Sequence, residues 1–469
     1  MAKKTINKEL TGAQDLYNFL FEACNIIRGP VSQDNFKDYI TPLLYYKRIS
    51  DVYDEETEEA LISSGGDKEY ASLPEQHRFV IPDGCHWQEV RERTENLGAA
   101  IVGAMRQIEI ANPDTLYGVL SMFSSQKWTN KAILNDSKIR DLIEHLSKRK
   151  LGNKDYPADL MGDAYEILLK KFADDSKAQA GEFYTPRSVV RLLVHILDPQ
   201  PGETVYDPAC GSGGMLIEAI RYMHDDSLCC GSIFGQEKNV VNAAIAKMNL
   251  FLHGASDFNV MQGDTLRDPK ILQGGNIAKF DCVIANPPFS LENWGATEWS
   301  SDKYKRNIYG TPSDSCGDYA WIQHMICSMS SGKGRMAVVM PQGILFRGNQ
   351  EAEIRKQLVE SDLIEAVVTL GDKLFYGTGL SPCFLIIRRM KPAHHSGRIL
   401  MIDGSKILTQ KRAQNILEEN DIDRLYSLYQ NYSDEEDYSR IVTLQEIRDK
   451  EYNLSPNRYV VYHKEEIRP

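Results

Sequence analysis

Apolar residues recur along the chain at two different spacings. From residue 1 to about 150 they return at helical intervals, over residues 16–23, 35–59, 87–110 and 139–146. From about residue 151 to 403, short continuous apolar runs alternate with amphipathic segments, and the runs lie at residues 204–206, 232–235, 259–262, 282–285, 335–341, 363–370 and 382–388. Strands alternating with helices predict a doubly wound, mostly parallel sheet, and the last two runs, which have no long helix between them, predict an antiparallel edge.

The change of pattern along the 469 residues predicts three domains. We expect a helical domain over residues 1–150, a seven-stranded Rossmann-like α/β domain over residues 151–403, and a helical C-terminal extension over residues 404–469. In the first domain, Pro42 is expected to kink or divide the helix of residues 35–59. In the extension, residues 407–418 and 422–429 carry helical periodicity.

The stretch with the clearest chemistry is Asp281-Cys-Val-Ile-Ala-Asn-Pro-Pro-Phe289. The apolar run before Asn286 reads as an interior strand, and the two prolines end it in an extended conformation. Ligands of open α/β sheets bind at the carboxyl ends of strands. An amide, carbonyl acceptors without a competing N–H, and the ring of Phe289 would suit a flat ring that bears an amino group. The plain alternative is a proline-terminated strand with a core phenylalanine.

A glycine-rich turn follows the first predicted strand, in Asp207-Pro-Ala-Cys-Gly-Ser-Gly-Gly214. Glycines allow a tight turn and a close approach of the backbone to a ligand. Asp207 would repel a pyrophosphate but attract an ammonium group. The next strand ends in Glu237, where an acid typically binds ribose hydroxyls, and the third ends in Gly263-Asp264, placed to contact an adenine ring. This order fits an adenosine that carries an amino acid better than it fits NAD.

Two further segments are candidates for binding. Gly181-Glu-Phe-Tyr-Thr-Pro-Arg187 is an aromatic loop that enters a helix through Thr185 and Pro186, a favourable N-cap and N1 pair. A helix start of this kind can hold a polar ligand through backbone N–H groups, although a simple capped helix is the alternative. Residues 292–310 mix tryptophans with lysines and arginine, as a nucleic-acid contact or a mobile lid would.

Composition narrows the class of protein. No apolar run approaches ~18 residues and no apolar signal core follows Met1, so we expect a cytoplasmic protein without a membrane segment. The nine cysteines form no C-x-x-C array, which favours reduced thiols and no metal site. The basic runs Lys47-Arg48 and Lys148-Arg149-Lys150 suit either phosphate or a solvated face. The net charge of −12 indicates either that a local basic surface exists on a chain that is acidic as a whole, or that another subunit supplies much of the binding to DNA.

Together the motifs resemble the amino-group DNA methyltransferases, through GEFYTP, DPACGSGG, Glu237, Gly263-Asp264 and NPPF in this order. The GEFYTP segment, the helical N-terminal domain, and YNLSPNRY near the C-terminus look more specifically like the modification subunit of type I restriction-modification systems. The resemblance covers nearly the whole chain. It implies a methyltransferase sheet, S-adenosylmethionine as cofactor, and methylation of N6 of an adenine that is flipped out of double-stranded DNA.

The resemblance also implies roles for individual residues. The cofactor site would be lined by Glu182, Phe183, Tyr184, Thr185, Pro186, Arg187, Ser212, Gly213, Gly214 and Glu237, with Asp207 facing the methionine ammonium and Asp264 the cofactor adenine. The target adenine would be received by Asn286, Pro287 and Phe289. The implied partners are a DNA-specificity subunit, joined through the terminal helical regions, and an ATP-dependent restriction subunit, with two copies of this chain in the complex.

Three alternatives stay open on the sequence. The same chemistry would serve an N4-cytosine DNA methyltransferase, although NPPF downstream of the cofactor motif favours adenine. The chain could be a catalytically silent scaffold subunit, against which the intact Asn286 and Glu237 argue. A protein glutamine methyltransferase uses a similar site, but the large flanking helical regions favour DNA.

Overall fold

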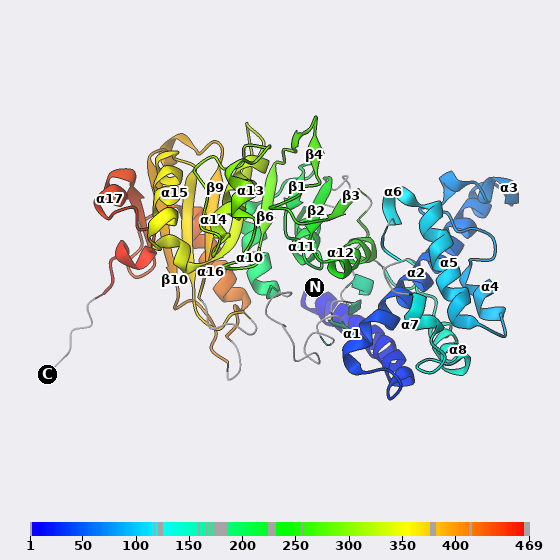
Figure 1. Cartoon of the computed structure of the whole chain (residues 1–469). Helices are drawn as coiled ribbons and strands as arrows, with labels where there is room; N and C mark the ends of the chain where they lie inside the picture. Colours follow the sequence, from blue (N-terminus) through cyan, green and yellow to red (C-terminus); the bar gives the residue numbers. More distant parts are fainter. Residues whose placement is uncertain are drawn as a thin grey trace. The chain divides into compact units, whose positions relative to one another are not determined.

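A computed structural model describes residues 2–116, 118–120, 125–157, 160–162, 164–165, 167–168, 171, 185–223, 231–255, 257–375, 381–411 and 415–463. The chain divides into two compact units (Figure 1). The first comprises Met1–Ala180 and Lys247–Ser256, and the second Gly181–Ala246 and Asp257–Pro469. None of the described helices is both long enough and apolar enough to cross a membrane.

The first unit is helical, as its periodicity predicted. Its helices are α1 Ala2–Ile27, α2 Lys37–Ser63, α3 Lys68–Ala71, α4 Trp87–Glu92, α5 Leu97–Ala111, α6 Pro113–Leu116, α7 Ser125–Thr129 and α8 Asp136–Leu146. Helix α1 packs against α8, where the rings of Phe19 and His145 stack at 4.5 Å. Pro42 lies inside α2 without dividing it. The single helix predicted over residues 87–110 is two, because Asn96 takes a left-handed conformation, with φ of 54°, between α4 and α5.

The basic pair in α2 has neither of the roles considered from the sequence. Lys47 and Arg48 are buried, with 3% and 2% of their surface exposed. Lys47 forms an ion pair with Asp51, and Arg48 donates to the carbonyl oxygens of Leu151 and Tyr156. Buried cations are tolerated only when paired and hydrogen bonded. Arg48 therefore joins α2 to the segment after α8, Lys47 is paired within α2, and neither faces solvent or phosphate.

The second unit is built on a nine-stranded sheet in the order β11-β10-β8-β9-β7-β6-β1-β2-β3. The strands are β1 Val205–Asp207, β2 Ile233–Glu237, β3 Phe258–Gln262, β6 Cys282–Ala285, β7 Arg335–Pro341, β8 Ile364–Leu370, β9 Pro382–Arg388, β10 Arg398–Gly404 and β11 Ser439–Thr443. All seven predicted strands are present. A small hairpin, β4 Leu272–Gln273 and β5 Asn276–Ile277, lies apart from the sheet order.

The antiparallel strand lies inside the sheet and not at its edge, which corrects the prediction. β9 pairs antiparallel with both β7 and β8. β10 then pairs parallel with β8, and β11 pairs antiparallel with β10 to form the actual edge. No strand was expected at β10 or β11. β11 is Ser-Arg-Ile-Val-Thr and has only two apolar residues in five positions, which is too short a pattern to identify against a helical background.

The C-terminal region is therefore only partly helical. Helices α16 Glu419–Asn431 and α17 Leu444–Asp449 flank β11, and α16 contains the predicted residues 422–429. The helix predicted over residues 407–418 is wrong: the described part is irregular, with an isolated bridge between Thr409 and Ile416. Asn415 donates through its backbone N–H to the carbonyl of Lys373 at 3.0 Å. This tertiary contact replaces the local hydrogen bonds that a helix would need.

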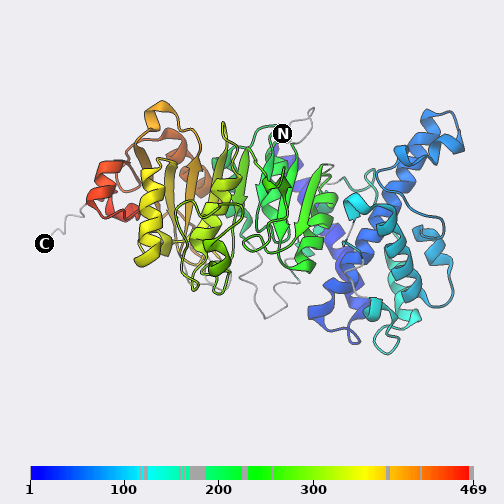
Figure 2. The same cartoon turned by 45° about the horizontal axis from the view of Figure 1, so that its top comes forward.

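Helices cover both faces of the sheet (Figures 1 and 2). Helices α14 Asp318–Ser328 and α15 Asn349–Glu360 lie on one face, and α10 Arg187–Leu197, α11 Gly214–Met223 and α16 lie on the other. Helix α12 Val240–Leu252 connects β2 to β3, and α13 Ala296–Ser300 follows β6. Because β1, β2, β3, β6 and β7 are parallel, their carboxyl ends, and the turns that follow them, lie at one edge.

Candidate functional site at the carboxyl edge of the sheet

The NPPF segment begins where β6 ends. All four residues of β6 are buried in the middle of the sheet, and Ala285 pairs with Val338 of β7. Asn286 follows directly, so the rigid central strand fixes its backbone. Pro287 is buried, Pro288 is exposed and Phe289 is half-buried. No described residue donates a hydrogen bond to the Pro287 carbonyl, which leaves that oxygen available as an acceptor.

The two ends of the Asn286 amide differ in their partners. Nδ2 donates to Oγ1 of Thr185 at 2.8 Å. Oδ1 is buried and accepts no hydrogen bond from the residues that the structure describes. A buried acceptor without a donor costs about 1–3 kcal/mol, and such an atom in a native site calls for an explanation. A ligand that brings an N–H group to Oδ1 would supply the missing donor.

The ring of Phe289 faces a second aromatic ring, that of Phe375. The ring centroids of Phe289 and Phe375 are 6.4 Å apart, with an angle of 55° between their planes. Phe375 is buried and belongs to the segment after β8. The next residue, Ser290, has a positive φ of 50°, and its backbone N–H donates to Oδ1 of Asp318 at 2.7 Å. Asp318, at the start of α14, therefore fixes the backbone directly after Phe289.

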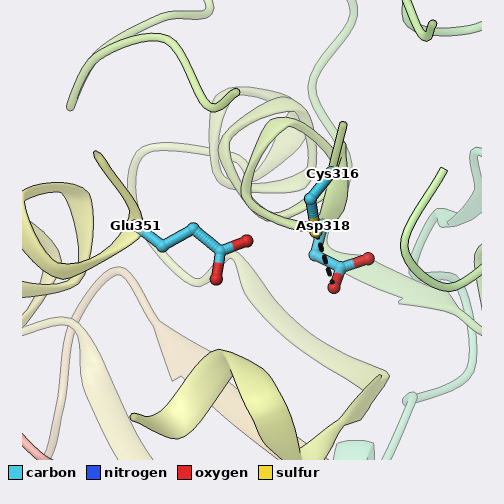
Figure 3. Close-up of side chains that lie close together, drawn as sticks. All are labelled: Cys316, Asp318 and Glu351. Atoms are coloured by element: carbon cyan, nitrogen blue, oxygen red, sulfur yellow. Dashed lines mark hydrogen bonds between the residues drawn. The ribbon is translucent and has the colours of Figure 1, made fainter. Parts of the chain in front are cut away.

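Asp318 belongs to a compact cluster with Cys316 and Glu351, and Figure 3 shows Glu351 reaching from α15 toward the other two. Their ligand atoms lie within 4.8 Å of one another, as metal ligands would. However, the Arg347 guanidinium donates to Asp318 at 2.8 Å, to Cys316 at 2.7 Å and to Glu351 at 3.1 Å. Burial, with the neighbouring carboxylates, raises the pKa of the Cys316 thiol to about 12. The arginine thus supplies the positive charge, and the cluster is an ion-pair network that supports the turn after Phe289.

The glycine-rich turn lies between β1 and α11. Gly211 and Gly213 have φ of +55° and +85°, which side chains rarely adopt. A Cβ built on Gly211 or Gly214 would meet nothing within 4 Å, so the turn borders open space. The backbone N–H of Gly211 donates to Oε2 of Glu237 at 3.0 Å, which joins the turn to the end of β2. Ser212 is half-buried in the same turn.

Two carboxyl groups face this turn, those of the buried Asp207 and the half-buried Glu237. Burial raises the pKa of Asp207 to about 8; the Ala209 N–H partly opposes this rise, and nearby Glu237 adds to it. Burial also raises the pKa of Glu237, against the hydrogen bonds that it accepts from Asn239 and Gly211. Within the described part of the chain, only the Ala209 N–H is hydrogen bonded to the Asp207 carboxyl group, at 2.9 Å. A pair of acids that forms no ion pair with a described cation suits a positively charged ligand and hydroxyl donors, which are the groups that S-adenosylmethionine presents.

The third acidic residue is engaged differently. Asp264 accepts from the backbone N–H groups of Leu266 and Arg267 at 3.2 and 3.3 Å. Its second oxygen forms an ion pair with Lys238 at 2.8 Å. The Lys238 side chain is 70% exposed, so this ion pair is weak and a ligand can displace it. Thr265, the next residue, donates to the carbonyl of Pro208 at 2.6 Å, which binds this turn to the glycine-rich turn.

Residues 292–310 direct most of their aromatic and basic side chains inward, and the DNA contact and the mobile lid considered for this segment stay predictions. Trp294 and Trp299 are 3% and 2% exposed, and their rings meet edge to face at 5.6 Å. Arg306 is 1% exposed. It donates to both carboxylate oxygens of Asp302 and to the carbonyls of Thr265 and Leu266. The aromatic and basic residues that suggested a DNA contact are thus mostly the interior of the segment, and only Lys303 and Lys305 remain exposed.

The structure brings most of the predicted site residues to one edge. Hydrogen bonds connect Thr185 to Asn286, Gly211 and Gly263 to Glu237, and Thr265 to Pro208. Pro186 is the N-cap of α10 and Arg187 its first residue. Glu182, Phe183 and Tyr184 lie outside the described residues. Sequence reasoning missed Phe375 and Asp318 as parts of the site, because neither adjoins a motif and only tertiary folding places them near Phe289.

Comparison with known proteins agrees with this geometry. Residues 156–467 match the family described as N-6 DNA Methylase, and residues 16–146 match the HsdM N-terminal domain. The chain is 35% identical over 448 residues to the type I restriction enzyme MjaVII methylase subunit of Methanocaldococcus jannaschii, covering 90% of this chain and 75% of that protein. Identity to the MjaVIII methylase subunit of the same organism is 32%, covering 96% and 79%.

A solved structure extends the likeness to the fold. The type I restriction-modification system methyltransferase subunit from Streptococcus thermophilus superposes with a TM-score of 0.82 at 26% identity. The alignment covers 96% of this chain and 100% of that one. Both units of the chain therefore have counterparts in a known structure.

Proposed function

The chain belongs to the N-6 DNA methylase family, and from this premise we propose that its NPPF segment holds an adenine of double-stranded DNA while N6 is methylated. The protein is an adenine-specific, S-adenosylmethionine-dependent DNA methyltransferase. The observation that carries the assignment of the site is the buried Oδ1 of Asn286, which has no donor among the described residues.

The residues that would hold the cofactor fit its charges. Asp207 would bind the methionine ammonium, Glu237 the ribose hydroxyls, and the open turn at Gly211 and Gly214 would admit the cofactor backbone. Asp264 would accept from the cofactor adenine after release from Lys238. When bound, S-adenosylmethionine supplies an electrophilic methyl group on a good leaving group.

The chemistry left to the protein is orientation of the target amino group. The lone pair of N6 is delocalised into the adenine ring, which makes it a poor nucleophile. Oδ1 of Asn286 and the Pro287 carbonyl would accept its two hydrogens and favour a pyramidal nitrogen with its lone pair directed at the methyl group. An amide cannot act as a general base, so Asn286 contributes alignment and charge stabilisation. Phe289 would stack on the extruded base, for about 1–3 kcal/mol against an unpairing cost of a few kcal/mol.

We expect Asn286→Ala to abolish transfer of labelled methyl to DNA while S-adenosylmethionine binding persists. Asn259→Ala, an exposed substitution on β3, is the matched control and should transfer normally. Digestion of the product to nucleosides should give N6-methyladenine. Finding N4-methylcytosine would refute the adenine assignment, and absence of transfer by the wild-type complex would favour a silent scaffold subunit. Loss of cofactor binding together with transfer in Asn286→Ala would refute the role of this residue.

The chain would act as the modification subunit of a type I restriction-modification complex in the cytoplasm. The seven described cysteines that are free agree with a reducing compartment. Sequence recognition would reside on a specificity subunit, because a net charge of −12 equips this chain poorly to bind DNA alone. That subunit would join two copies of this chain through the helical unit and residues 404–469, and an ATP-dependent restriction subunit would complete the complex.

A further inference from the structure

Thr185 precedes α10 but does not cap it, contrary to the interpretation of Thr185-Pro186 as an N-cap and N1 pair. The N-cap of α10 is Pro186, which makes no side-chain capping hydrogen bond. Threonine hydroxyls at helix starts usually accept from the N2 or N3 backbone N–H. Here the hydroxyl oxygen of Thr185 instead accepts from Nδ2 of Asn286 at 2.8 Å, across 101 positions of sequence. Its contribution is thus to the NPPF segment and not to the helix.

The hydrogen bond restricts rotation of the Asn286 amide. The last torsion of an asparagine side chain is broad and roughly two-fold, so an unrestrained amide would sample many planes. Contact with the Thr185 hydroxyl leaves two orientations, since a hydroxyl can accept from Nδ2 or donate to Oδ1. Only the orientation seen here, with Nδ2 on Thr185, presents Oδ1 to an incoming amino group. In the other orientation Nδ2 would face the amino group of the base, so that two N–H donors would meet without an acceptor.

We infer that Thr185 is a positioning residue for methyl transfer, which acts by holding the plane of the Asn286 amide so that Oδ1 meets the amino group of the target base. The inference rests on the proposed function and adds a link to it. Thr185 lies in the segment assigned to the cofactor site, so one hydroxyl connects the strand end that would hold the base with the loop that would line the cofactor. Misplacement of a reacting group by about 1 Å can cost a factor of about 100 in rate.

The test compares Thr185→Val, which keeps the shape and removes the hydroxyl, with Thr185→Ser, which keeps the hydroxyl. Each variant is assembled with its specificity subunit on DNA that carries the recognition site. Ser188→Ala, in the first turn of α10, is the control for the helix start. We expect Thr185→Val to lower kcat roughly 10- to 100-fold, with the Kd for S-adenosylmethionine and the unfolding temperature within error of the wild type. Thr185→Ser should restore most of kcat, and Ser188→Ala should leave it unchanged.

A second background makes the test independent of the native amide. In Asn286→Asp the hydroxyl would reverse and donate to one carboxylate oxygen, which leaves the other to accept from N6. We therefore expect Thr185→Val to lower the residual rate of Asn286→Asp by a similar factor. This measurement also decides the matter if Thr185→Val alone is poorly folded, since Thr185→Ala can be compared with Thr185→Ser in the same background.

The outcomes separate this inference from the proposed function. Wild-type transfer with an undiminished kcat in Thr185→Val overturns the positioning role and leaves the proposed function intact. A weaker Kd for S-adenosylmethionine with unchanged kcat also overturns it, because Thr185 would then serve the cofactor alone. No transfer by the wild-type complex refutes the proposed function and this role with it.

Discussion

At the scale of single residues, burial of Asp207 couples the cofactor site to pH. A carboxyl group with its pKa raised to about 8 by burial is mostly protonated near neutral pH. An ammonium group placed beside it would favour the charged form and lower that pKa. The amino group of S-adenosylmethionine has an ordinary α-amino pKa of about 7.7–8.0. The bound pair needs one charged carboxylate and one charged ammonium. Below about pH 8 the free carboxyl group and the free amino group together carry one proton too many for this pair, and above about pH 8 they carry one too few.

We therefore expect the affinity for S-adenosylmethionine to pass through a maximum near pH 8. Below it, binding must release a proton from Asp207, and above it, binding must take up a proton on the ligand, so affinity falls by up to about tenfold per pH unit on each side. Calorimetric titrations near pH 7 in buffers of different ionisation enthalpy measure the released proton.

Asp207→Asn isolates the acid side of this profile. The amide cannot titrate, so proton release near pH 7 should vanish and the affinity should no longer fall as the pH decreases from 8 to 7. If the wild type released no proton near pH 7, then Asp207 would already be charged in the free protein, and burial would not keep its carboxyl group protonated at that pH.

At the scale of elements, residues 292–310 show how a mostly irregular segment, with only the short helix α13 in its described residues, is held by a buried cation. Arg306 lies at its centre and is stacked at 4.5 Å on the ring of Trp299. Its guanidinium reaches Asp302 within the segment and the carbonyls of Thr265 and Leu266 in the turn after β3. Arg267 adds a hydrogen bond from its side chain to the carbonyl of Asn293 at 2.6 Å. The segment after the NPPF motif is thus bound to the turn that carries Asp264.

Removal of this cation should loosen the segment. Arg306→Met keeps much of the apolar volume but leaves a buried Asp302 carboxylate and two buried carbonyls without their donor. We expect a loss of about 3–5 kcal/mol in the free energy of unfolding, measured by urea denaturation, and faster amide exchange across residues 292–310. Lys303→Met, at an exposed neighbour, should change stability by less than about 0.5 kcal/mol. Equal exchange in Arg306→Met and wild type would show that the tryptophans alone hold the segment.

The sequence predicted those elements whose signal is local. Helix α10 was predicted to begin at Thr185-Pro186 and is found at Arg187–Leu197, because a proline marks its start. Strands β7, β8 and β9 were found where continuous apolar runs lie. The burial of Arg306 and the place of β9 between β7 and β8 depend on partners distant in sequence. Basic residues beside tryptophans look the same in sequence whether they face DNA or form an ion-paired interior.

The same distinction applies to the site. Asn286, Asp207 and Glu237 could be assigned because the sequence places each at the end of a predicted strand, next to prolines, glycines or a loop. The hydroxyl of Thr185 could be placed near a ligand, but its bond to Asn286 joins two motifs far apart in the chain, and no local pattern encodes that. Asp318 adjoins no motif, although its carboxylate accepts from the backbone N–H of Ser290.

At the scale of the whole molecule, the acidic balance of the chain limits what it can do alone. Phosphate neutralisation by Lys and Arg supplies most non-specific affinity for DNA, and this chain carries 54 Lys and Arg against 66 Asp and Glu. Arginines at the carboxyl edge already form internal ion pairs. Arg306 pairs with Asp302, and Arg347 pairs with Asp318. Extrusion of a base requires that the protein bind the DNA backbone on both sides of it. This binding must come from another protein surface or from a basic face in the assembled complex.

We therefore expect the isolated chain to bind duplex DNA weakly at about 150 mM salt, with a Kd no tighter than roughly 1–100 μM, the range of non-specific binding. Its complex with the specificity subunit should bind at least about 100-fold tighter, and the logarithm of that affinity should fall steeply and linearly with the logarithm of salt concentration. Fluorescence anisotropy on one labelled duplex, titrated from about 50 to 300 mM salt, measures both. If the isolated chain bound as tightly as the complex and with the same salt slope, then the basic surface would belong to this chain, and its net charge would have concealed it.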